Sequence, residues 1–427
     1  YWAIDLRGEP RTNDTEAARA ALLAAPPIFE PDRAVAVHER TPIARYALRF
    51  APRDGATPEL LASVREGLAW LAAHQDIRGW WDTANFADSC GRIGRSVCDG
   101  TVLRSRYVGV TGLALLAFLA DGNTPEHGPF ASSVARAVGV LLELQDGKTG
   151  MFFADWAERD AAGVERRYVP SDFVYDHAIA TLALSEALAV SEHSALRKRL
   201  SRAVAASLGA HNPYAGWGYS ATADGSGDTS ITAWMALALD AARRAGLAVD
   251  DAVFRDAAAY CDELTDPASG RTGYNARGSI GARVSGVNDS YPQSCETLTG
   301  CALVCRQLAG IAFDDSPISR LGARLILRSL PDADELLLAT DPYGWQWCTL
   351  ALRELDDTAH WPPWRTHLEQ TLLGLQRRDG DTRGSWDGFG PWAYAYGRIG
   401  STALCVLSLQ ATWRYAPAQR AADRPKR

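Results

Sequence analysis

From residue 58 onward, two kinds of hydrophobic pattern alternate along the chain. One kind has charges on one face of a helix, as in residues 196–208 (LRKRLSRAVAASL). The other is almost uncharged around its circumference, as in residues 111–119 (TGLALLAFL). A helix that is polar on one side fits an outer layer in contact with water, whereas a helix that is apolar all round must be buried. The pattern therefore predicts two concentric layers of helices.

The two kinds of helix belong to a unit that recurs along the chain. Each unit has an outer helix that ends in Gln or His, a turn of Gly and an aromatic residue, and an inner helix. The landmarks Gln75, Gln145 and His211 follow one another at intervals of roughly 70 residues, a repeat period rather than a heptad. The fourth unit is weaker and the fifth lacks the turn, but the sixth has it again after Gln376. Six units predict six helix pairs.

The inner stretch of the sixth unit, which follows Arg398, is as apolar as that of the first. An open array of repeats would leave this last inner helix exposed, so we expect the ring to close on itself. The expected fold is all-α, a closed α/α toroid or (α/α)6 barrel over residues 57–427. Residues 1–56 contain six prolines and scattered charges, and we expect them to form an irregular N-terminal arm that packs on the barrel.

The turns of Gln, Gly and Trp resemble the QW-type repeats of squalene-hopene and oxidosqualene cyclases, and they are similar to the repeats of protein prenyltransferase β subunits. The likeness covers about residues 58–415. In style it resembles bacterial prenyltransferase and squalene oxidase repeat proteins, which implies the terpenoid cyclase fold. In cyclases these landmarks tie neighbouring repeats together, so we assign an architectural role to the matching set: Gln75, Gln145, Gln376, Trp81, Trp217 and Trp386.

Class II terpene cyclases carry Asp-x-Asp-Asp-Thr before an inner helix, and the central Asp protonates an alkene or epoxide. Aligned on the shared Thr and Trp, this motif falls on residues 225–229 (GSGDT). Asp228 and the Thr are kept, but Gly227 stands at the position of the proton donor. A second acidic run, residues 332–335, follows an outer helix and is interpreted as a solvated loop. The resemblance therefore implies a cyclase-like fold without the usual acid.

Protein prenyltransferases hold zinc with Asp, Cys and His, the Asp and Cys lying two residues apart at the start of an inner helix. The matching positions here resemble Asp228 and Ser230, and a serine hydroxyl is a poor zinc ligand. Cys90 and Cys98 lie in an apparent loop, where a disulfide is expected in an oxidising compartment, ahead of a metal pair. We predict no metal site and no cofactor.

Polar and aromatic residues recur just before or at the starts of the inner helices. If these helices all start at one end of the ring, the residues converge on its mouth, which is the default binding site. The candidate catalytic residues are Asp176, His177 and Asp228. Each has a structural alternative: Asp228 fits a helix N-cap, and His177 fits a histidine bonded to a neighbouring repeat. The candidate substrate-binding residues are Tyr107, Tyr175, Tyr291, Tyr343, Tyr396 and Arg398.

A net charge of −7 and a pI near 5.7 offer no basic face, so a nucleic-acid partner is not expected. No run of 18 apolar residues is present, so we predict no transmembrane segment. Because the sequence begins at Tyr1, a processed N-terminus is one expectation and the compartment stays open.

Three functions remain open at this stage, and whether the protein is an enzyme is one of the questions. The first is a binding protein that holds a hydrophobic small molecule or peptide at the central mouth without turnover. The second is a non-standard isoprenoid cyclase or transferase with a displaced acid and aromatic faces that stabilise carbocations. The third is a carbohydrate-active (α/α)6 lyase or hydrolase, whose hydrolytic form needs two carboxylates roughly 5 to 10 Å apart.

Overall fold

The structure is a computed structural model, and it describes residues 56–91, 98–154, 156–159, 165–191, 194–281, 283–293, 295–333, 337–355 and 359–414. The predicted N-terminal arm, residues 1–56, therefore lies almost wholly outside the described residues. The last thirteen residues of the predicted barrel domain, 415–427, also lie outside them. The described chain is helical, as predicted, apart from one short hairpin.

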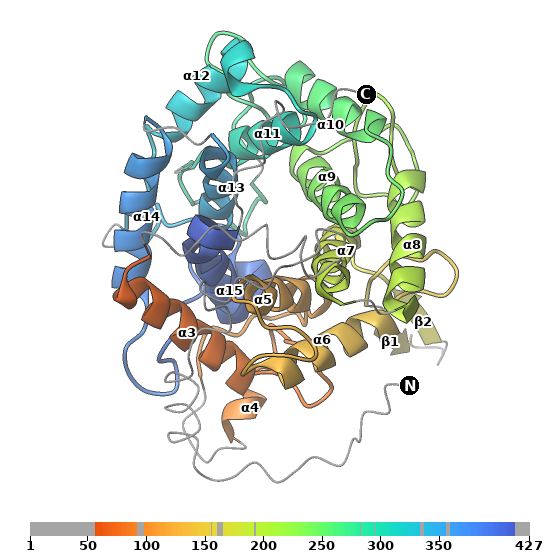
Figure 1. The fold of residues 1–427 in the computed structure, drawn as a ribbon, viewed down its shortest axis with the longest axis vertical. Helices are drawn as coiled ribbons and strands as arrows, with labels where there is room; N and C mark the ends of the chain where they lie inside the picture. The colour runs from red at the N-terminus through yellow and green to blue at the C-terminus, as the bar shows by residue number, and fades with distance from the viewer. Residues whose placement is uncertain are drawn as a thin grey trace, which may run out of the picture.

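The strongly apolar stretches form the inner helices, which surround the centre of the molecule in Figure 1. Every residue of α5 is buried, and α7 buries nearly all of its length after the first turn. Each inner helix contacts the next one along the chain, and the last contacts the first. In the described residues this inner layer consists of α5 (Val108–Ala120), α7 (Phe173–Val190), α9 (Thr229–Arg244), α11 (Thr297–Leu308), α13 (Pro342–Arg353) and α15 (Ala393–Arg414).

The stretches with one charged face form the outer helices (Figure 1). On α8, for example, Leu196, Leu200 and Val204 are buried while Arg197 and Lys198 are exposed. Such a helix buries its apolar stripe against the inner layer and keeps its charged face hydrated. In the described residues this outer layer consists of α3 (Pro58–Ala73), α6 (Ala131–Glu143), α8 (Ser194–Gly209), α10 (Ala252–Glu263), α12 (Pro317–Ile326) and α14 (Trp361–Leu375).

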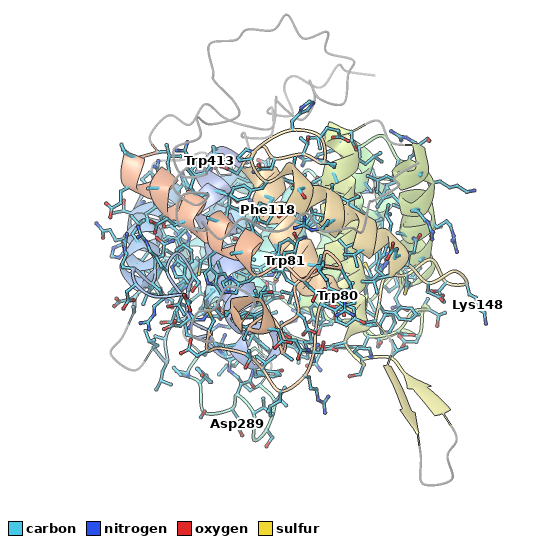
Figure 2. All side chains as sticks on the ribbon, turned by 90° about the horizontal axis from the view of Figure 1, so that it is seen from below. Trp80, Trp81, Phe118, Lys148, Asp289 and Trp413 are labelled. Atoms are coloured by element: carbon cyan, nitrogen blue, oxygen red, sulfur yellow. The ribbon has the colours of Figure 1, made fainter. Side chains whose placement is uncertain are left out.

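Three shorter elements complete the described chain. Helix α4 (Asp88–Gly91) follows the first turn, and the 3-10 helix η1 (Phe313–Asp315) precedes α12. Strands β1 (Trp156–Arg159) and β2 (Glu165–Tyr168) pair antiparallel as a hairpin, an element that the hydrophobic pattern does not predict. The hairpin projects from one end of the molecule in Figure 2.

The landmark glutamines join neighbouring units. The side-chain amide of Gln75 donates to the carbonyl of Gly79 in its own turn, at 2.7 Å, and to the carbonyl of Ser133 in the next outer helix, at 2.9 Å. Gln145 makes the equivalent bonds within its own turn and to Arg199 of α8. One amide therefore closes its own turn and fixes the following outer helix.

The last glutamine joins the two ends of the repeat array. The amide of Gln376 donates to the carbonyl of Gly384, at 3.0 Å, and to that of Ser63 in α3, at 2.9 Å, and the Ser63 hydroxyl donates back to Gln376 Oε1 at 2.7 Å. Gly384 has a φ of +90°, and a Cβ there would lie 2.5 Å from the carbonyl oxygen of Glu66. Only glycine allows this close approach. The last turn thus contacts α3 as the turns of Gln75 and Gln145 contact the next outer helix.

The landmark tryptophans fix each turn to its own two helices. The indole N–H of Trp81 donates to the carbonyl of Leu71 at 2.7 Å, and its backbone N–H donates to Thr111 Oγ1 at 2.9 Å. Trp217 and Trp386 make the same pair of bonds in their own units. All three rings are fully buried. These contacts fit the architectural role expected for the landmarks.

The inner helices start at the same end of the ring, because their first turns contact one another. The backbone N–H of Gly109, at the start of α5, donates to Asp176 at the start of α7, and Tyr175 is hydrogen-bonded to Ser230 at the start of α9. Figure 2 shows Trp413, near the end of α15, at the opposite end of the molecule from Asp289, in the loop before α11. We call the end that holds Asp289 and the starts of the inner helices the mouth.

Among the described residues, one helix, α7, is long and apolar enough to cross a membrane by length and composition. Within the structure, 83% of that stretch is buried, and α7 packs between α5 and α9 in the inner layer. Its hydrophobicity is therefore accounted for by its place in the core.

Candidate functional site

Asp228 caps the N-terminus of α9 with one of its two carboxylate oxygens. Oδ1 accepts hydrogen bonds from the backbone N–H groups of Ser230 and Ile231, at 2.8 and 2.9 Å, and from the Ser230 hydroxyl at 2.7 Å. The residue is 2% exposed, and Oδ2 has no hydrogen-bond partner within 3.5 Å, although the side chains of Tyr219 and Tyr274 lie near enough to interact with this carboxylate. A buried acceptor without a donor costs free energy, so this oxygen is an uncommon feature.

Four tyrosines surround this carboxylate: Tyr175, Tyr219, Tyr260 and Tyr274. Burial, and secondly the negative charge of Asp228, raise the pKa of all four, so they are neutral phenols at physiological pH. The Tyr175 hydroxyl lies 2.7 Å from that of Ser230, and the hydroxyls of Tyr219 and Tyr274 lie 2.8 Å apart.

Of these tyrosines, only Tyr175 was predicted from the sequence. Tyr219 follows the Gly-Trp turn of the third unit, Tyr274 is the aromatic residue of the fourth turn, and Tyr260 lies on an outer helix. Each belongs to a pattern that was explained by architecture alone. The sequence signal that could have found them is a tyrosine where other units have a tryptophan or no aromatic residue.

Aromatic rings continue from α9 across the mouth to α15. The indole N–H of Trp234 donates to the Tyr343 hydroxyl at 3.0 Å. The Tyr343 ring lies 6.4 Å from Trp392, which lies 6.3 Å from the half-exposed Tyr394. Burial mainly, and then the neighbouring Cys301 and Asp228, raise the pKa of Tyr343, although the Trp234 hydrogen bond acts in the opposite direction. We call this set the mouth cluster: Tyr175, Tyr219, Asp228, Ser230, Trp234, Tyr274, Tyr343 and Trp392.

Asp176 lies beside this cluster at the start of α7. Its Oδ1 accepts a hydrogen bond from the backbone N–H of Gly109 at 2.9 Å. Burial chiefly, and then the charge of Asp172, raise the pKa of Asp176 to about 7, although the Gly109 bond and Arg106 act in the opposite direction. Arg106 forms an ion pair with Asp172. Asp176 is therefore a carboxyl group that changes protonation near neutral pH.

His177 packs inside the wall of its unit, and its ring does not join the mouth cluster. Its Nδ1 accepts a hydrogen bond from the backbone N–H of Phe152 at 3.1 Å, and Nε2 lies 2.9 Å from Ser207 Oγ. Because the Ser207 hydroxyl already donates to the carbonyl of Ala203, Nε2 is the donor to Ser207. Burial lowers the pKa of His177 to about 4. Both nitrogens of this neutral ring are therefore engaged in hydrogen bonds within the fold. This geometry agrees with the structural role considered for His177 and gives no support to a catalytic one.

Arg398 also lies in the wall, where it joins the last inner helix to the first unit. Its side chain is 1% exposed and forms ion pairs with Asp99 and Asp387. It also donates to Ser385 Oγ at 2.9 Å. The guanidinium of Arg398 is thus engaged in these ion pairs and this hydrogen bond. The expected contact of Arg398 with a substrate has no support from the geometry.

The remaining predicted tyrosines lie at the mouth end in different settings. The Tyr107 ring lies 4.8 Å from that of Trp80, outside the mouth cluster. Tyr396 is buried, and its hydroxyl donates to the carbonyl of Phe389 at 3.3 Å. Tyr291 is partly buried in the loop before α11. Tyr175 and Tyr343 are thus the two predicted tyrosines that the structure brings together around Asp228.

The backbone at Gly227 leaves no room for a side chain. A Cβ at this position would lie 1.9 Å from the carbonyl oxygen of Ala215 and 2.7 Å from the Tyr260 ring. Contacts this short require the backbone to move. This position, which the motif resemblance matched to the cyclase acid, therefore accepts only glycine unless the backbone shifts. Ser230 stands where the resemblance to prenyltransferases would place the zinc-binding cysteine. Its hydroxyl is hydrogen-bonded to Asp228 and Tyr175.

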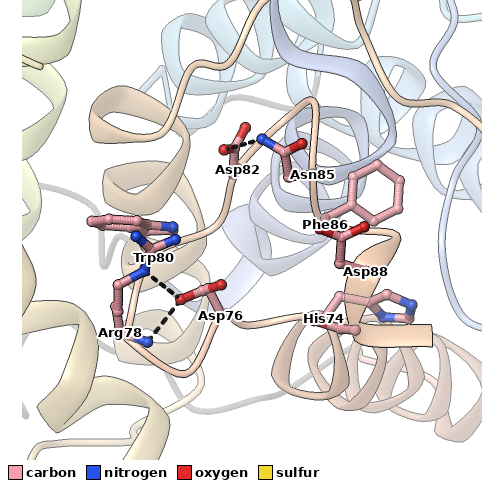
Figure 3. A pocket seen from close by; sticks show the side chains of 9 residues that line it. His74, Asp76, Arg78, Trp80, Asp82, Asn85, Phe86 and Asp88 are labelled. Atoms are coloured by element: carbon pink, nitrogen blue, oxygen red, sulfur yellow. Dashed lines mark hydrogen bonds and ion pairs between the residues drawn. The ribbon is translucent and has the colours of Figure 1, made fainter. Parts of the chain in front are cut away.

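Two surface pockets lie outside the mouth cluster. One, of about 390 Å³, is lined by residues near the end of α14, from Gly374 to Asp379, together with Leu337, Asp387 and Phe389. The other, of about 120 Å³, is lined by residues of the first turn, including His74 and Trp80 (Figure 3). Neither contains a residue that was predicted to be catalytic or substrate-binding.

No protein-family model matches the chain, and no curated protein matches its sequence. Among solved structures, the chain is similar to the type II terpene cyclase MstE from Scytonema, with 17% identity and a TM-score of 0.50 over 83% of this chain and 98% of that chain. An Arg-to-Ala variant of MstE in complex with its substrate, geranylgeranyl dihydroxybenzoate, matches with 17% identity and a TM-score of 0.51, over 83% and 97%. An Asp-to-Ala variant in complex with its product, merosterolic acid A, matches with 17% identity and a TM-score of 0.50 over the same shares. This chain therefore has a terpene cyclase-like fold of the α/α-toroid type.

Proposed function

We propose that this chain is a closed toroid of six helix pairs that binds a hydrophobic molecule carrying a hydrogen-bond donor at the mouth cluster. The observation that carries the proposal is Asp228 Oδ2, a buried carboxylate oxygen with no donor within 3.5 Å, which faces the phenols of Tyr219 and Tyr274 among partly accessible aromatic rings. A ligand hydroxyl or N–H group would satisfy this oxygen, and the rings of Tyr343 and Trp392 would cover its apolar part. Apolar walls with a few convergent polar groups are typical of small-molecule sites.

The contacts around the ring support the six-pair toroid. Inner helix α15 contacts α5, and Gln376 is bonded to Ser63 as Gln75 is to Ser133. The domain bounds of residues 57–427, and an arm over residues 1–56 that packs on the barrel, stay predictions.

The chemistry of the MstE complexes supports the ligand class. The substrate named in that complex, geranylgeranyl dihydroxybenzoate, joins a long apolar chain to an aromatic ring with hydroxyl donors. A molecule of this kind offers both features that the mouth cluster can recognise. A hydrophobic peptide with a free N–H group offers them too, and it remains within the proposal.

We further propose that the protein binds without the alkene protonation of class II cyclases. Gly227 has no space for an acid, and Asp228 uses one oxygen to cap α9. A donor that protonates an alkene must be unusually acidic. The available carboxyl group beside the cluster, Asp176, has the opposite shift, because burial raises its pKa to about 7.

That shift favours one second candidate, a non-standard isoprenoid enzyme in which Asp176 transfers a proton to or from a more polar group. A carboxyl with a pKa near the working pH is suited to general acid–base catalysis. The carbohydrate-active alternative gains no support, because the neighbouring carboxylate Asp172 is engaged in an ion pair with Arg106.

The proposal is tested by measuring the affinity of the purified full chain for geranylgeranyl dihydroxybenzoate, with tryptophan fluorescence and calorimetry as the two readouts. Asp228→Asn keeps an oxygen for the cap but replaces an acceptor by a donor. We expect it to weaken binding by about 10-fold or more. Trp392→Ala should also weaken binding, whereas Tyr214→Ala, at a residue that is 90% exposed and outside the cluster, should leave it unchanged.

Two results would count against the proposal. Equal binding by wild type and Asp228→Asn would remove the role of the carboxylate. Conversion of the ligand, detected by mass spectrometry, would replace the binding protein by the enzyme, and loss of that conversion in Asp176→Asn would select the second candidate.

A further inference from the structure

A cluster of one histidine and two cysteines lies in the first unit, apart from the mouth cluster. His74 follows the end of α3, Cys90 belongs to α4, and Cys98 begins the segment that leads to α5. Their exposed fractions are 4%, 2% and 4%. One nitrogen and two sulfur atoms lie within 4.8 Å of one another, and both thiols are free. In the part of the chain that the structure describes, no other group of His, Cys, Asp or Glu meets this condition.

The neighbours of His74 fix both its tautomer and its orientation. Nδ1 lies 2.8 Å from the carbonyl oxygen of Trp70. A carbonyl can only accept, so in the neutral ring Nδ1 carries the hydrogen and Nε2 holds the lone pair. The ring stacks on Trp70 at 4.1 Å and meets the edge of Phe86 at 5.9 Å. A histidine that binds a metal through one ring nitrogen usually donates the N–H of the other nitrogen to a carboxylate, a backbone carbonyl or water.

The lone pair of Nε2 faces the two sulfur atoms. Nε2 lies 3.2 Å from Cys90 Sγ and 3.4 Å from Cys98 Sγ. In a tetrahedral zinc site with Zn–N near 2.0 to 2.1 Å and Zn–S near 2.3 Å, nitrogen and sulfur ligands are about 3.6 Å apart. A shift of a few tenths of an ångström would therefore bring the three atoms to the spacing of zinc ligands.

We propose that His74, Cys90 and Cys98 bind one zinc ion and fill three of its four tetrahedral positions. Two thiolates and an imidazole are a soft donor set that suits zinc, and two thiolate charges balance the charge of Zn²⁺. On binding, each thiol loses its proton to solvent and each sulfur forms a bond to the metal. The ion would join the end of α3 to α4 and to the entry of α5.

The proposed site also borders the smaller of the two pockets. His74 lines this pocket of about 120 Å³ together with Asp76, Asp82 and Asp88 (Figure 3). The site is independent of the proposed function, because none of its ligands belongs to the mouth cluster. It also lies elsewhere in the chain than Asp228 and Ser230, where the resemblance to prenyltransferases would place zinc. It therefore departs from our sequence-based prediction of no metal.

The test is the zinc content of the full chain, purified without chelators and measured by inductively coupled plasma mass spectrometry. We expect one zinc per chain in the wild type and nearly complete loss in His74→Ala, Cys90→Ser and Cys98→Ser. Cys405→Ser is the matched control, because Cys405 is equally buried but lies outside the cluster. It should keep the full zinc content.

A second measurement needs no variant and covers the case in which a substitution prevents folding. Replacing the metal of the wild type by Co²⁺ should give the intense visible bands of a tetrahedral site and a thiolate-to-cobalt band in the near ultraviolet. A wild type without zinc or these bands, with Cys90 and Cys98 joined in a disulfide by peptide mapping, would overturn the proposal. Zinc retained by all three variants would also overturn it.

Discussion

Asp176 combines a backbone hydrogen bond that favours its charge with a partly buried position that opposes it. Burial prevails, and the pKa of its carboxyl rises to about 7 from an ordinary 3.8. The folded chain therefore binds a proton here between about pH 4 and 7 that the unfolded chain releases. The contribution of Asp176 to stability is favourable at low pH and is lost as the pH rises through this window.

Asp176→Asn should accordingly stabilise the protein at alkaline pH. The amide keeps an oxygen for the Gly109 N–H but carries no charge, so we expect the free energy of unfolding at pH 8 to rise by about 1 to 3 kcal/mol. At pH 4 the difference should nearly vanish. Urea denaturation at both pH values measures this.

Asp146 provides a control of opposite sign for that substitution. Hydrogen bonds from the side chain and backbone of Thr149 lower the pKa of Asp146. Its charged form is thus favoured in the folded chain, and Asp146→Asn should lower stability at pH 8. An Asp176→Asn variant that is less stable than wild type at pH 8 would contradict the assigned cause of the shift.

The hydrogen bond between the turn and the inner helix is made by a different residue in the second unit than in three others. In three other units, a threonine of the inner helix accepts a hydrogen bond from the backbone N–H of the turn tryptophan: Thr111, Thr232 and Thr402. In the second unit, Phe152 stands in the turn and His177 accepts the equivalent bond. The histidine therefore fulfils the role of a threonine in this unit.

His177→Thr should keep the fold and reduce its sensitivity to acid. The folded pKa of about 4 lies below the ordinary 6.5, so the neutral ring stabilises the chain above pH 6.5, and this contribution is lost as the pH falls toward 4. We expect the variant to lose about 1 to 3 kcal/mol at pH 7, because a smaller side chain leaves a cavity. Between pH 7 and 4.5, however, it should lose less stability than wild type.

Urea denaturation across that range is the measurement for His177→Thr. Thr111→Val is the control, because it removes the same hydrogen bond from the first unit without changing a titratable group. Its loss of stability should not depend on pH. An equal pH dependence in wild type and His177→Thr would show that His177 is not the group that titrates.

At the scale of the elements, the sequence patterns located the helices well and missed the hairpin. Charge on one face separates α8 from the uncharged α5, and burial follows that difference. Strands β1 and β2, in contrast, are four residues each and carry charged residues without a clear apolar alternation. Their pairing depends on contacts between the two strands, which a pattern along one strand does not contain.

At the scale of the whole molecule, the contact between Gln376 and Ser63 joins residues 313 positions apart. If this contact closes the ring, the two side chains must depend on each other energetically. In a double-mutant cycle, Ser63→Ala and Gln376→Ala should show a coupling energy of about 0.5 to 1.5 kcal/mol. Chemical denaturation of the wild type, both single variants and the double variant provides the four free energies.

The control cycle pairs Ser63→Ala with Gln145→Ala, whose hydrogen bonds lie in a different unit. These two effects should add to within about 0.5 kcal/mol. A coupling energy near zero for Ser63 and Gln376 would mean that the ends of the array behave as in an open solenoid.

The sequence by itself determined the alternation of outer and inner helices and the turns that join them. These features depend on residues close together in the chain, where periodicity and residue type are sufficient. It also placed Asp228 at the start of α9, because an N-cap is a local interaction.

Only the tertiary structure decided which of these residues meet. It directed His177 and Arg398 into the wall, gathered Tyr219, Tyr260 and Tyr274 around Asp228, and brought His74 to Cys90 and Cys98. The burial of a side chain, an acceptor left without a donor and the distances between metal-ligand atoms all depend on contacts between segments that are far apart in the chain. A pattern along the sequence cannot specify them, because they depend on how the helices pack around the ring.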